Sequence, residues 1–253
     1  MFAALDRLLA PAPDPARVGW LKGCEYAHRG LHSDTVGENS PAGFAGAIAR
    51  GMGIECDVQE TRDGRAMVYH DWTLERLTGE SGPVAGRDAE ELGQVALAIG
   101  GDPIPTLEKV LSQVAGQVPL LVEIKSKRGK DPSRLCGAVS AALKDYNGAV
   151  AVMSFDPRVP RWFALYAPDV ARGLVMTETG QGEALGPLQR RFALWHARPH
   201  FLAYDVRDLP SVFASAQRRR GFPLLTWTVR SPELRTVAAL HADAPIAEGA
   251  GLA

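Results

Sequence analysis

Short apolar runs rich in β-branched and aromatic residues alternate with stretches of helical apolar spacing along nearly the whole chain. The runs predict strands at 26–29, 54–59, 120–125, 150–154, 172–175, 201–205 and 224–228, with a weak eighth at 244–247. The stretches between them predict helices at 42–50, 107–114, 132–146, 157–166, 183–192, 210–220 and 232–240. Because about 250 residues is the usual size of a (β/α)8 TIM barrel, we expect this α/β fold. An open doubly wound sheet is the alternative.

The alternation is interrupted once, at residues 71–105, which are rich in glycine and charge and contain no long strand. Just before them, Asp63-Gly64 lies between two extended runs and predicts a β-hairpin. We therefore expect a single barrel domain over residues 1–253, with a small insertion at about 71–105 after the second strand. Enlarged loops of a barrel commonly shape the entrance to its active site.

Charge and cysteine content exclude several classes of protein. The formal net charge is −1, with 28 basic and 29 acidic residues, so no positive field attracts nucleic acid or an anionic membrane. Cys24, Cys56 and Cys136 are odd in number and widely spaced, which argues against a disulfide framework and a structural zinc site. The first residues do not resemble a secretory signal, and no apolar stretch reaches spanning length. We expect a cytoplasmic enzyme with neither a nucleic-acid partner nor stable membrane insertion, and its oligomeric state stays open.

Polar residues gather at the carboxyl ends of the predicted strands, where a barrel builds its active site. Glu55 and Asp57 are two apart on one strand, so both carboxylates face the same side, and Glu123 ends the next strand of the barrel. A divalent cation would relieve the repulsion between such carboxylates, and an all-oxygen donor set suits Mg²⁺ or Ca²⁺ better than zinc. The alternative is a pair of surface carboxylates.

Two histidines and two cations accompany these acids. His28 and His70 titrate near neutral pH, so one can act as general base and the other as general acid, in an order that the sequence leaves open. Arg29 offers a planar fork to phosphate oxygens, and Lys125 a point charge. With a cation, this set indicates a site that stabilises the charge developing on a phosphate group.

These residues carry a family resemblance. His28-Arg29-Gly30, Glu38-Asn39-Ser40, Gly53-Ile54-Glu55-Cys56-Asp57-Val58 and Val68-x-His70-Asp71 resemble the signature of the glycerophosphodiester phosphodiesterases. Further blocks at 104–108, 122–125, 154–156 and 226–229 resemble later parts of that signature in the same order. The resemblance covers about residues 27–240, and an ordered series of this length is more specific than any single block.

The resemblance implies a (β/α)8 barrel, a divalent cation and hydrolysis of small-molecule glycerophosphodiesters to glycerol phosphate and an alcohol. By position it implies Glu55, Asp57 and Glu123 as metal ligands, His28 and His70 as acid and base, and Arg29 and Lys125 as phosphate-binding residues. Trp227 would line the substrate pocket, although it can equally be a core aromatic of the barrel. In this type of family a substrate hydroxyl attacks phosphorus to form a cyclic phosphate, which water then opens.

Two departures from the family pattern and three alternative functions accompany this interpretation. Gly37 stands where the family usually has proline, and the last strand is followed by Glu248 in place of the usual closing block. A phospholipase D-like enzyme that acts on lysophospholipids or sphingophospholipids and releases a cyclic phosphate is the closest alternative. Lys125 could instead form a Schiff base in an aldolase. A catalytically silent scaffold is disfavoured because every proposed histidine and ligand is present.

Overall fold

The computed structural model describes residues 2–127, 129–179 and 186–253, and within them two compact units. Residues 26–150 form the middle unit, and residues 1–25 and 151–253 form the terminal unit. Among the described residues, eight parallel strands alternate with helices along the chain. This is the (β/α)8 TIM-barrel fold, so the predicted fold class is confirmed.

The strands of the middle unit are centred on one long strand. They are β1 (Tyr26–Ala27), β2 (Gly53–Glu60), β3 (Ala66–Val68) and β4 (Leu120–Ile124). Strand β2 pairs in parallel with β1 and with β4, while β3 folds back antiparallel to β2 and forms the hairpin predicted from Asp63-Gly64. In the β2–β4 register Asp57 lies opposite Glu123. The carboxyl ends of β2 and β4 therefore bring acidic residues side by side.

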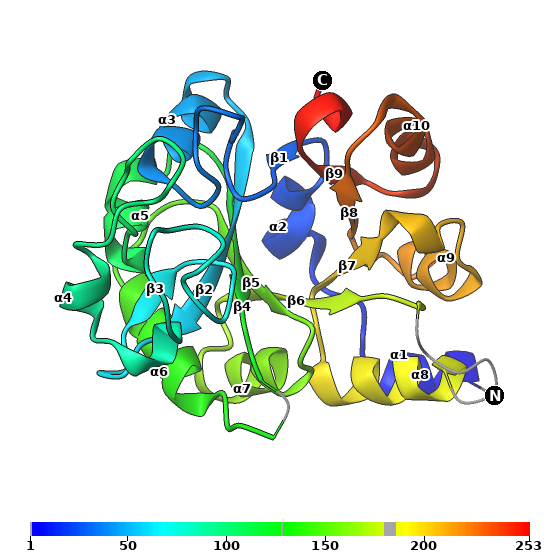
Figure 1. Ribbon diagram of the computed structural model, residues 1–253. Coiled ribbons are helices and arrows are strands. Elements are labelled where there is room, and N and C mark those ends of the chain that lie inside the picture. Colours follow the sequence, from blue (N-terminus) through cyan, green and yellow to red (C-terminus); the bar gives the residue numbers. More distant parts are fainter. Residues whose placement is uncertain (1, 128, 180–185) are drawn as a thin grey trace. The chain divides into compact units, whose positions relative to one another are not determined.

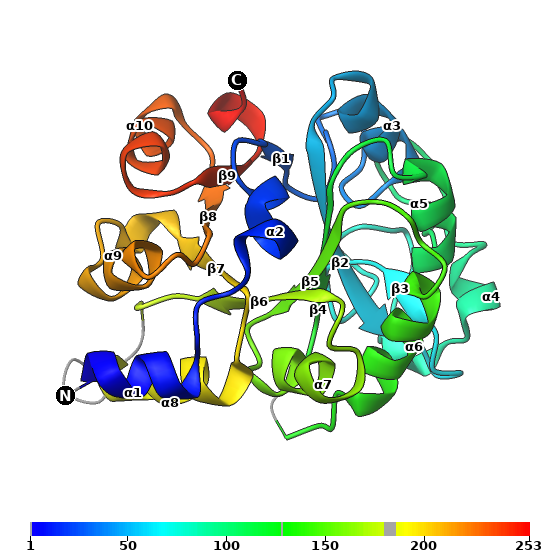
Figure 2. The same ribbon diagram turned by 180° about the vertical axis from the view of Figure 1, so that it is seen from behind.

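Helices pack against these strands in the order of the chain. They are α3 (Pro41–Ala49), the short η2 (Val84–Gly86) and α4 (Ala89–Leu92), α5 (Leu107–Val114) and α6 (Ser133–Leu143). Figure 2 shows α3, α5 and α6 following one another along one side of the unit. Ser40 starts α3, because its hydroxyl accepts a hydrogen bond from the Gly43 amide at 3.0 Å and Pro41 follows at the first helical position.

The segment between β3 and α5 has a small hydrophobic cluster of its own. Leu74, Val84, Leu92 and Ile104 are almost completely buried in it, together with Tyr69. The chain there contains only isolated bridges and short helices, so this packing is what holds it in place. It thus forms a defined wall next to the carboxyl end of β3.

The terminal unit continues the alternation with five parallel strands in chain order (Figure 1). They are β5 (Val150–Ser154), β6 (Ala171–Met176), β7 (Phe201–Asp205), β8 (Leu224–Val229) and β9 (Ala244–Ala247), the last being the weak eighth strand of the prediction. The helices are α1 (Phe2–Leu9), α2 (Pro15–Val18), α7 (Arg158–Tyr166), α8 (Gly186–Ala197), α9 (Val212–Arg219) and α10 (Pro232–His241), with short turns η1 (Gly19–Leu21), η3 (Val206–Asp208) and η4 (Gly249–Gly251).

The predicted helix at 183–192 differs most from the observed element. Its first three residues lie outside the described residues, and α8 runs to Ala197, five residues beyond the predicted end. The extension carries Trp195, whose indole Nε1 donates a hydrogen bond to the buried Asp6 on α1 at 2.8 Å. This tertiary contact, which no local pattern reveals, attaches α1 to α8. In the described part of the chain, no helix combines the length and apolar character needed to cross a bilayer.

A tight contact in the terminal unit predicts that one added methyl group lowers the stability of the protein. Gly173 on β6 pairs with Phe201 on β7, and a Cβ atom at Gly173 would clash with the Phe201 ring. We expect Gly173→Ala to lower the free energy of unfolding in urea by about 1–3 kcal/mol. Gly137→Ala, in the middle of α6 with no atom near its Cβ position, is the control and should raise it by about 0.5–1 kcal/mol. Equal effects of the two changes would contradict this account of the packing.

Candidate active site

Three carboxylates meet at the carboxyl ends of β2 and β4. Glu55 and Asp57 alternate onto one face of β2, and the register places Glu123 of β4 beside Asp57. One oxygen of each carboxylate lies within 4.8 Å of one oxygen of each of the others. All three side chains are buried, with exposed fractions of 2%, 2% and 8% for Glu55, Asp57 and Glu123. The structure thus brings together the three residues that the sequence singled out as ligands.

The mutual repulsion of these acids is visible in their pKa values. Burial and the neighbouring charges of Asp57 and Glu123 raise the pKa of Glu55 well above its usual value, and burial likewise raises the pKa of Glu123. Burial opposes ionisation of Asp57 as well, but Lys125 and Arg29 outweigh it and hold its pKa at about 2. A compact, buried, all-oxygen donor set with an excess of negative charge fits a hard divalent cation.

Lys125 lies directly against this cluster. Its Nζ is 3.1 Å from Asp57 Oδ1 and 3.0 Å from Glu123 Oε1. Burial disfavours the charged amine, yet the two carboxylates outweigh burial and raise the pKa of Lys125. The amine is therefore protonated at neutral pH and is not a nucleophile, which disfavours the Schiff-base alternative.

Two residues with left-handed backbone connect the loops after β1 to the acids. Arg29 has φ +56° and Asn39 has φ +54°, both uncommon for residues other than glycine. The Arg29 amide donates to Glu55 Oε2 at 3.1 Å, and the Asn39 side chain donates to Asp57 Oδ2 at 3.0 Å while accepting from the Asp57 amide at 3.2 Å. The Arg29 guanidinium also donates to Glu38 at 2.8 Å. These contacts hold the strained conformations in place and orient two of the three carboxylates.

Each histidine lies near one of the acids. His28 follows β1 and is 9% exposed, with its Nε2 4.0 Å from Glu55 Oε2. His70 is positioned by the preceding residue, because the Tyr69 amide donates to the Asp57 carbonyl at 3.0 Å. His70 Nδ1 lies 2.7 Å from Asp71 Oδ1. Burial lowers the pKa of His70, so its imidazole is mainly neutral at pH 7.

Arg76 links the two sides of the site. Its Nε donates to Asp71 Oδ2 at 2.6 Å, and its Nη1 donates to Glu38 Oε2 at 2.9 Å. The hydrogen bonds that Asp71 accepts from Arg76 and His70 hold the pKa of Asp71 well below its usual value. One guanidinium therefore positions both the partner of His70 and the partner of Arg29.

Several residues of this arrangement received no role from the sequence. Glu38, Asn39 and Asp71 lie inside the quoted motifs, which was the available signal, but their contacts join segments with no common periodicity. Arg76 lies in the segment interpreted as an insertion, where nothing marked it.

Trp227 belongs to the terminal unit, in β8. Its Nε1 donates to the Ala203 carbonyl at 3.0 Å, and its ring packs edge-on against Phe155 with centroids 5.2 Å apart. Glu248, the departure from the family pattern, forms an ion pair with Arg230 at 2.5 Å in the same unit.

The raised pKa of Glu55 predicts that ionisation of this side chain lowers the stability of the protein. A raised pKa in the folded state means that the contribution of Glu55 to stability is present at low pH and is lost as the pH rises. We expect Glu55→Gln, measured by urea unfolding in chelator at pH 7.5, to be more stable than the wild type by about 1–4 kcal/mol, with the difference shrinking towards pH 5.

Asp205→Asn is the matched control for Glu55→Gln. Asp205 is buried too, but Arg207 pairs with it at 2.5 Å and its pKa is lowered, since hydrogen bonds from Arg207 outweigh burial. Its neutralisation should therefore lower stability at pH 7.5. A destabilised Glu55→Gln protein would contradict the account of repulsion.

Known proteins resemble this chain over most of its length. The model of the glycerophosphoryl diester phosphodiesterase family matches residues 28–247. The chain is 31% identical over 229 residues to a glycerophosphodiester phosphodiesterase of Caldanaerobacter subterraneus subsp. tengcongensis, and the alignment covers 84% of this chain and 88% of that protein.

Solved structures share the fold. A phosphodiesterase of Oleispira antarctica, solved in complex with the product sn-glycerol-3-phosphate, has a TM-score of 0.78 at 22% identity and covers 90% of this chain and 93% of its own. A glycerophosphodiester phosphodiesterase of Thermotoga maritima has a TM-score of 0.71 at 24% identity, with coverages of 88% and 94%. Since the family model spans most of the sequence, the chain belongs to the glycerophosphoryl diester phosphodiesterase family.

Proposed function

We propose that this phosphodiesterase hydrolyses glycerophosphodiesters to glycerol phosphate and an alcohol, with a divalent cation and two histidines. The observation that carries the proposal is the convergence of three buried carboxylates within 4.8 Å of one another. The side chains of Arg29 and Lys125 both lie against one of them, Asp57. The phosphodiesterase of Oleispira antarctica binds sn-glycerol-3-phosphate as its product, and we propose a product of the same kind here.

Glu55, Asp57 and Glu123 would hold the cation, Mg²⁺ or Ca²⁺. When bound, such an ion polarises phosphoryl oxygens and stabilises the negative charge that develops on them. Arg29 and Lys125 bind the same phosphate group from the protein side, because both lie against Asp57 and carry their charge at neutral pH.

The proton steps fall to the two histidines. Asp71 accepts from Nδ1 of His70, which leaves Nε2 as the acceptor, so His70 takes the proton of the attacking substrate hydroxyl. The alcohol leaves with a proton from His28, and a cyclic phosphate remains. In the second stage water attacks the cyclic phosphate, and the histidines exchange roles to give the linear phosphomonoester.

The wider context of the enzyme is part of the proposal. We infer one catalytic domain over residues 1–253 with an insertion at about 71–105, and Trp227 as an apolar surface for the substrate's glycerol carbons. The odd number and wide spacing of the three cysteines argue against a disulfide framework, which supports a cytoplasmic location.

Substitution of the histidines and removal of metal test the proposed reaction. We expect His28→Ala and His70→Ala each to lower kcat for glycerophosphoglycerol by about 10²–10⁴-fold, because each removes one proton-transfer group. Chelator should abolish turnover, and added Mg²⁺ or Ca²⁺ should restore it. His241→Ala, at the end of α10, is the matched control and should keep full activity.

Phosphorus NMR identifies the product in the same assay. A linear phosphomonoester is expected, whereas an accumulating cyclic phosphate favours the phospholipase D-like alternative. Turnover that chelator leaves intact, or a fully active His70→Ala variant, would overturn the proposal.

The pH dependence tests the role of His70. Since burial lowers the pKa of His70 and its neutral form is the active one, the acidic limb of kcat/KM should have its midpoint below pH 6.5. The hydrogen bond that His70 donates to Asp71 raises this pKa, so Asp71→Asn should move the limb to lower pH and also reduce kcat through loss of the fixed tautomer. Asp145→Asn, an exposed change of equal charge, should leave the profile in place. A limb that moves to higher pH in Asp71→Asn would contradict this role.

A further inference from the structure

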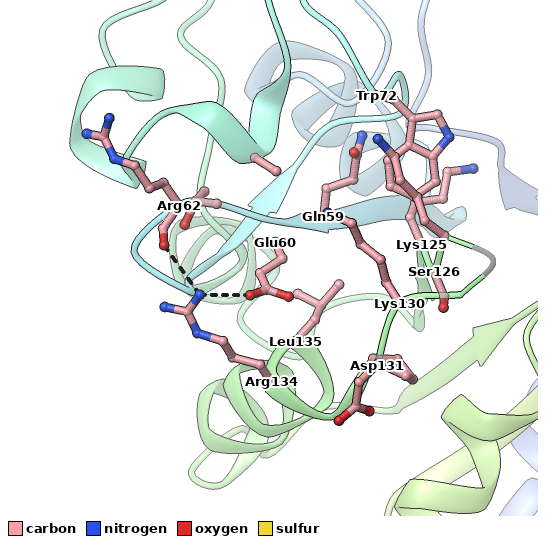
Figure 3. Close-up of a pocket in the computed structure, with 14 residues that line it drawn as sticks. Gln59, Glu60, Arg62, Trp72, Lys125, Ser126, Lys130, Asp131, Arg134 and Leu135 are labelled. Atoms are coloured by element: carbon pink, nitrogen blue, oxygen red, sulfur yellow. Dashed lines mark hydrogen bonds and ion pairs between the residues drawn. The ribbon is translucent and has the colours of Figure 1, made fainter.

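A cavity of about 510 Å³ opens beside the carboxylate cluster in the middle unit. It lies between the end of β2, Trp72 from the segment after β3, and the loop between β4 and α6 (Figure 3). Lys125 lines it, and the same amine contacts Asp57 and Glu123 at 3.1 and 3.0 Å. The cavity therefore adjoins the proposed phosphate site through Lys125, which belongs to both.

The cavity lies far enough along β2 from the carboxylates to hold one of the two groups that a phosphodiester links. Gln59 lines it and lies two residues beyond Asp57, which is about 7 Å further along the strand at about 3.3 Å per residue. Gln59 is 2% exposed, and its Nε2 donates to the carbonyls of Tyr69 and Asp71. Gln59 is therefore a fixed part of the cavity wall, and its distance from Asp57 is about the length of one ester substituent of a phosphodiester.

The cavity carries an excess of positive charge. Its lining includes five cationic side chains and two acidic ones, which are Arg62, Lys125, Lys127, Lys130 and Arg134 against Glu60 and Asp131. Both arginines are already paired, Arg62 with Asp88 at 2.7 Å and Arg134 with Glu60 at 2.9 Å, as Figure 3 shows for the second pair.

Lys127 and Lys130 differ from these two arginines. Neither forms an ion pair with any residue that the structure describes. Lys127 Nζ lies 4.6 Å from the centroid of the Trp72 ring, and this cation–π contact holds the amine at the cavity wall. In Figure 3, Lys130 reaches from the β4–α6 loop into the space lined by Gln59.

We infer that this cavity is the subsite for the alcohol part of the substrate and that it selects alcohols bearing a phosphate of their own. The inference rests on the proposed function. Lysine amines are mobile point charges that bind phosphate oxygens, and two of them line this cavity. Trp72, 39% exposed, offers a flat surface to the carbon skeleton between the two phosphates. Cationic alcohols such as choline are repelled by the same two lysines.

A matched pair of substrates tests this selectivity. Glycerophosphoinositol 4-phosphate and glycerophosphoinositol differ only in one phosphate on the alcohol. We expect the wild type to favour the first in kcat/KM by about tenfold at low salt, mainly through KM, with the preference falling as ionic strength rises. The double variant Lys127→Gln/Lys130→Gln should bring the ratio of the two kcat/KM values close to one. This ratio is independent of any general loss of folding or activity.

The control variant is Lys109→Gln/Lys144→Gln, which removes two exposed lysines of the same unit outside the cavity. It should keep the wild-type ratio, because it changes the net charge equally but not the subsite. A ratio near one in the wild type, or the same ratio in both double variants, would overturn the inference while leaving the proposed function intact.

Hydrolysis of neither substrate by the wild type would count against the proposed function. In that event the subsite is tested by calorimetry with inositol 4-phosphate, the alcohol that the reaction would release. Binding that weakens about tenfold in Lys127→Gln/Lys130→Gln, and not in Lys109→Gln/Lys144→Gln, supports the subsite. Equal affinity in all three proteins refutes it.

Discussion

The repulsion among three buried carboxylates is the constraint on which the site depends. Strand β2 places Glu55 and Asp57 on one face, and the parallel register with β4 adds Glu123 beside them. Without positive charge nearby, such carboxylates would take up protons or move apart. Lys125 and Arg29 offset part of the charge by lying against Asp57, which leaves a compact oxygen donor set that could hold a cation. Bringing three acids together in this way costs stability, as is common at functional sites.

The same charges organise the surrounding loops. Glu55 and Asp57 accept hydrogen bonds from Arg29 and Asn39, which both have left-handed backbone. From there Glu38, Arg76 and Asp71 continue as a chain of ion pairs that ends at His70. Disturbing one member therefore affects both Arg29 and His70. The basic cavity adjoins the acids through Lys125, and Lys127 adds to its positive lining.

Much of this could be predicted from the sequence because it follows from local periodicity. Strand alternation places Glu55 and Asp57 together, and the order of strands places Glu123 next to them, so the acid cluster follows from spacing and fold class. The eighth strand was also visible, weakly, at 244–247, and is β9. The contact between Trp195 and Asp6, which fixes the extended end of α8, joins residues 189 apart, so no pattern within a window reveals it.

The missed residues share a physical cause. Arg76 acts through side-chain geometry that depends on how the segment after β3 packs around Tyr69 and Leu74, and composition alone shows only a loop rich in glycine and charge. Lys127 and Lys130 are notable because both line one cavity together with Trp72, and a cavity is a property of packing.

The most direct test of the central claim is a crystal soaked in Mn²⁺, with anomalous scattering used to locate the ion. The account predicts one strong peak about 2–2.6 Å from carboxylate oxygens of Glu55, Asp57 and Glu123, which is lost in Glu55→Gln crystals. A peak elsewhere, or none at these three side chains while the wild-type enzyme turns over, would contradict it.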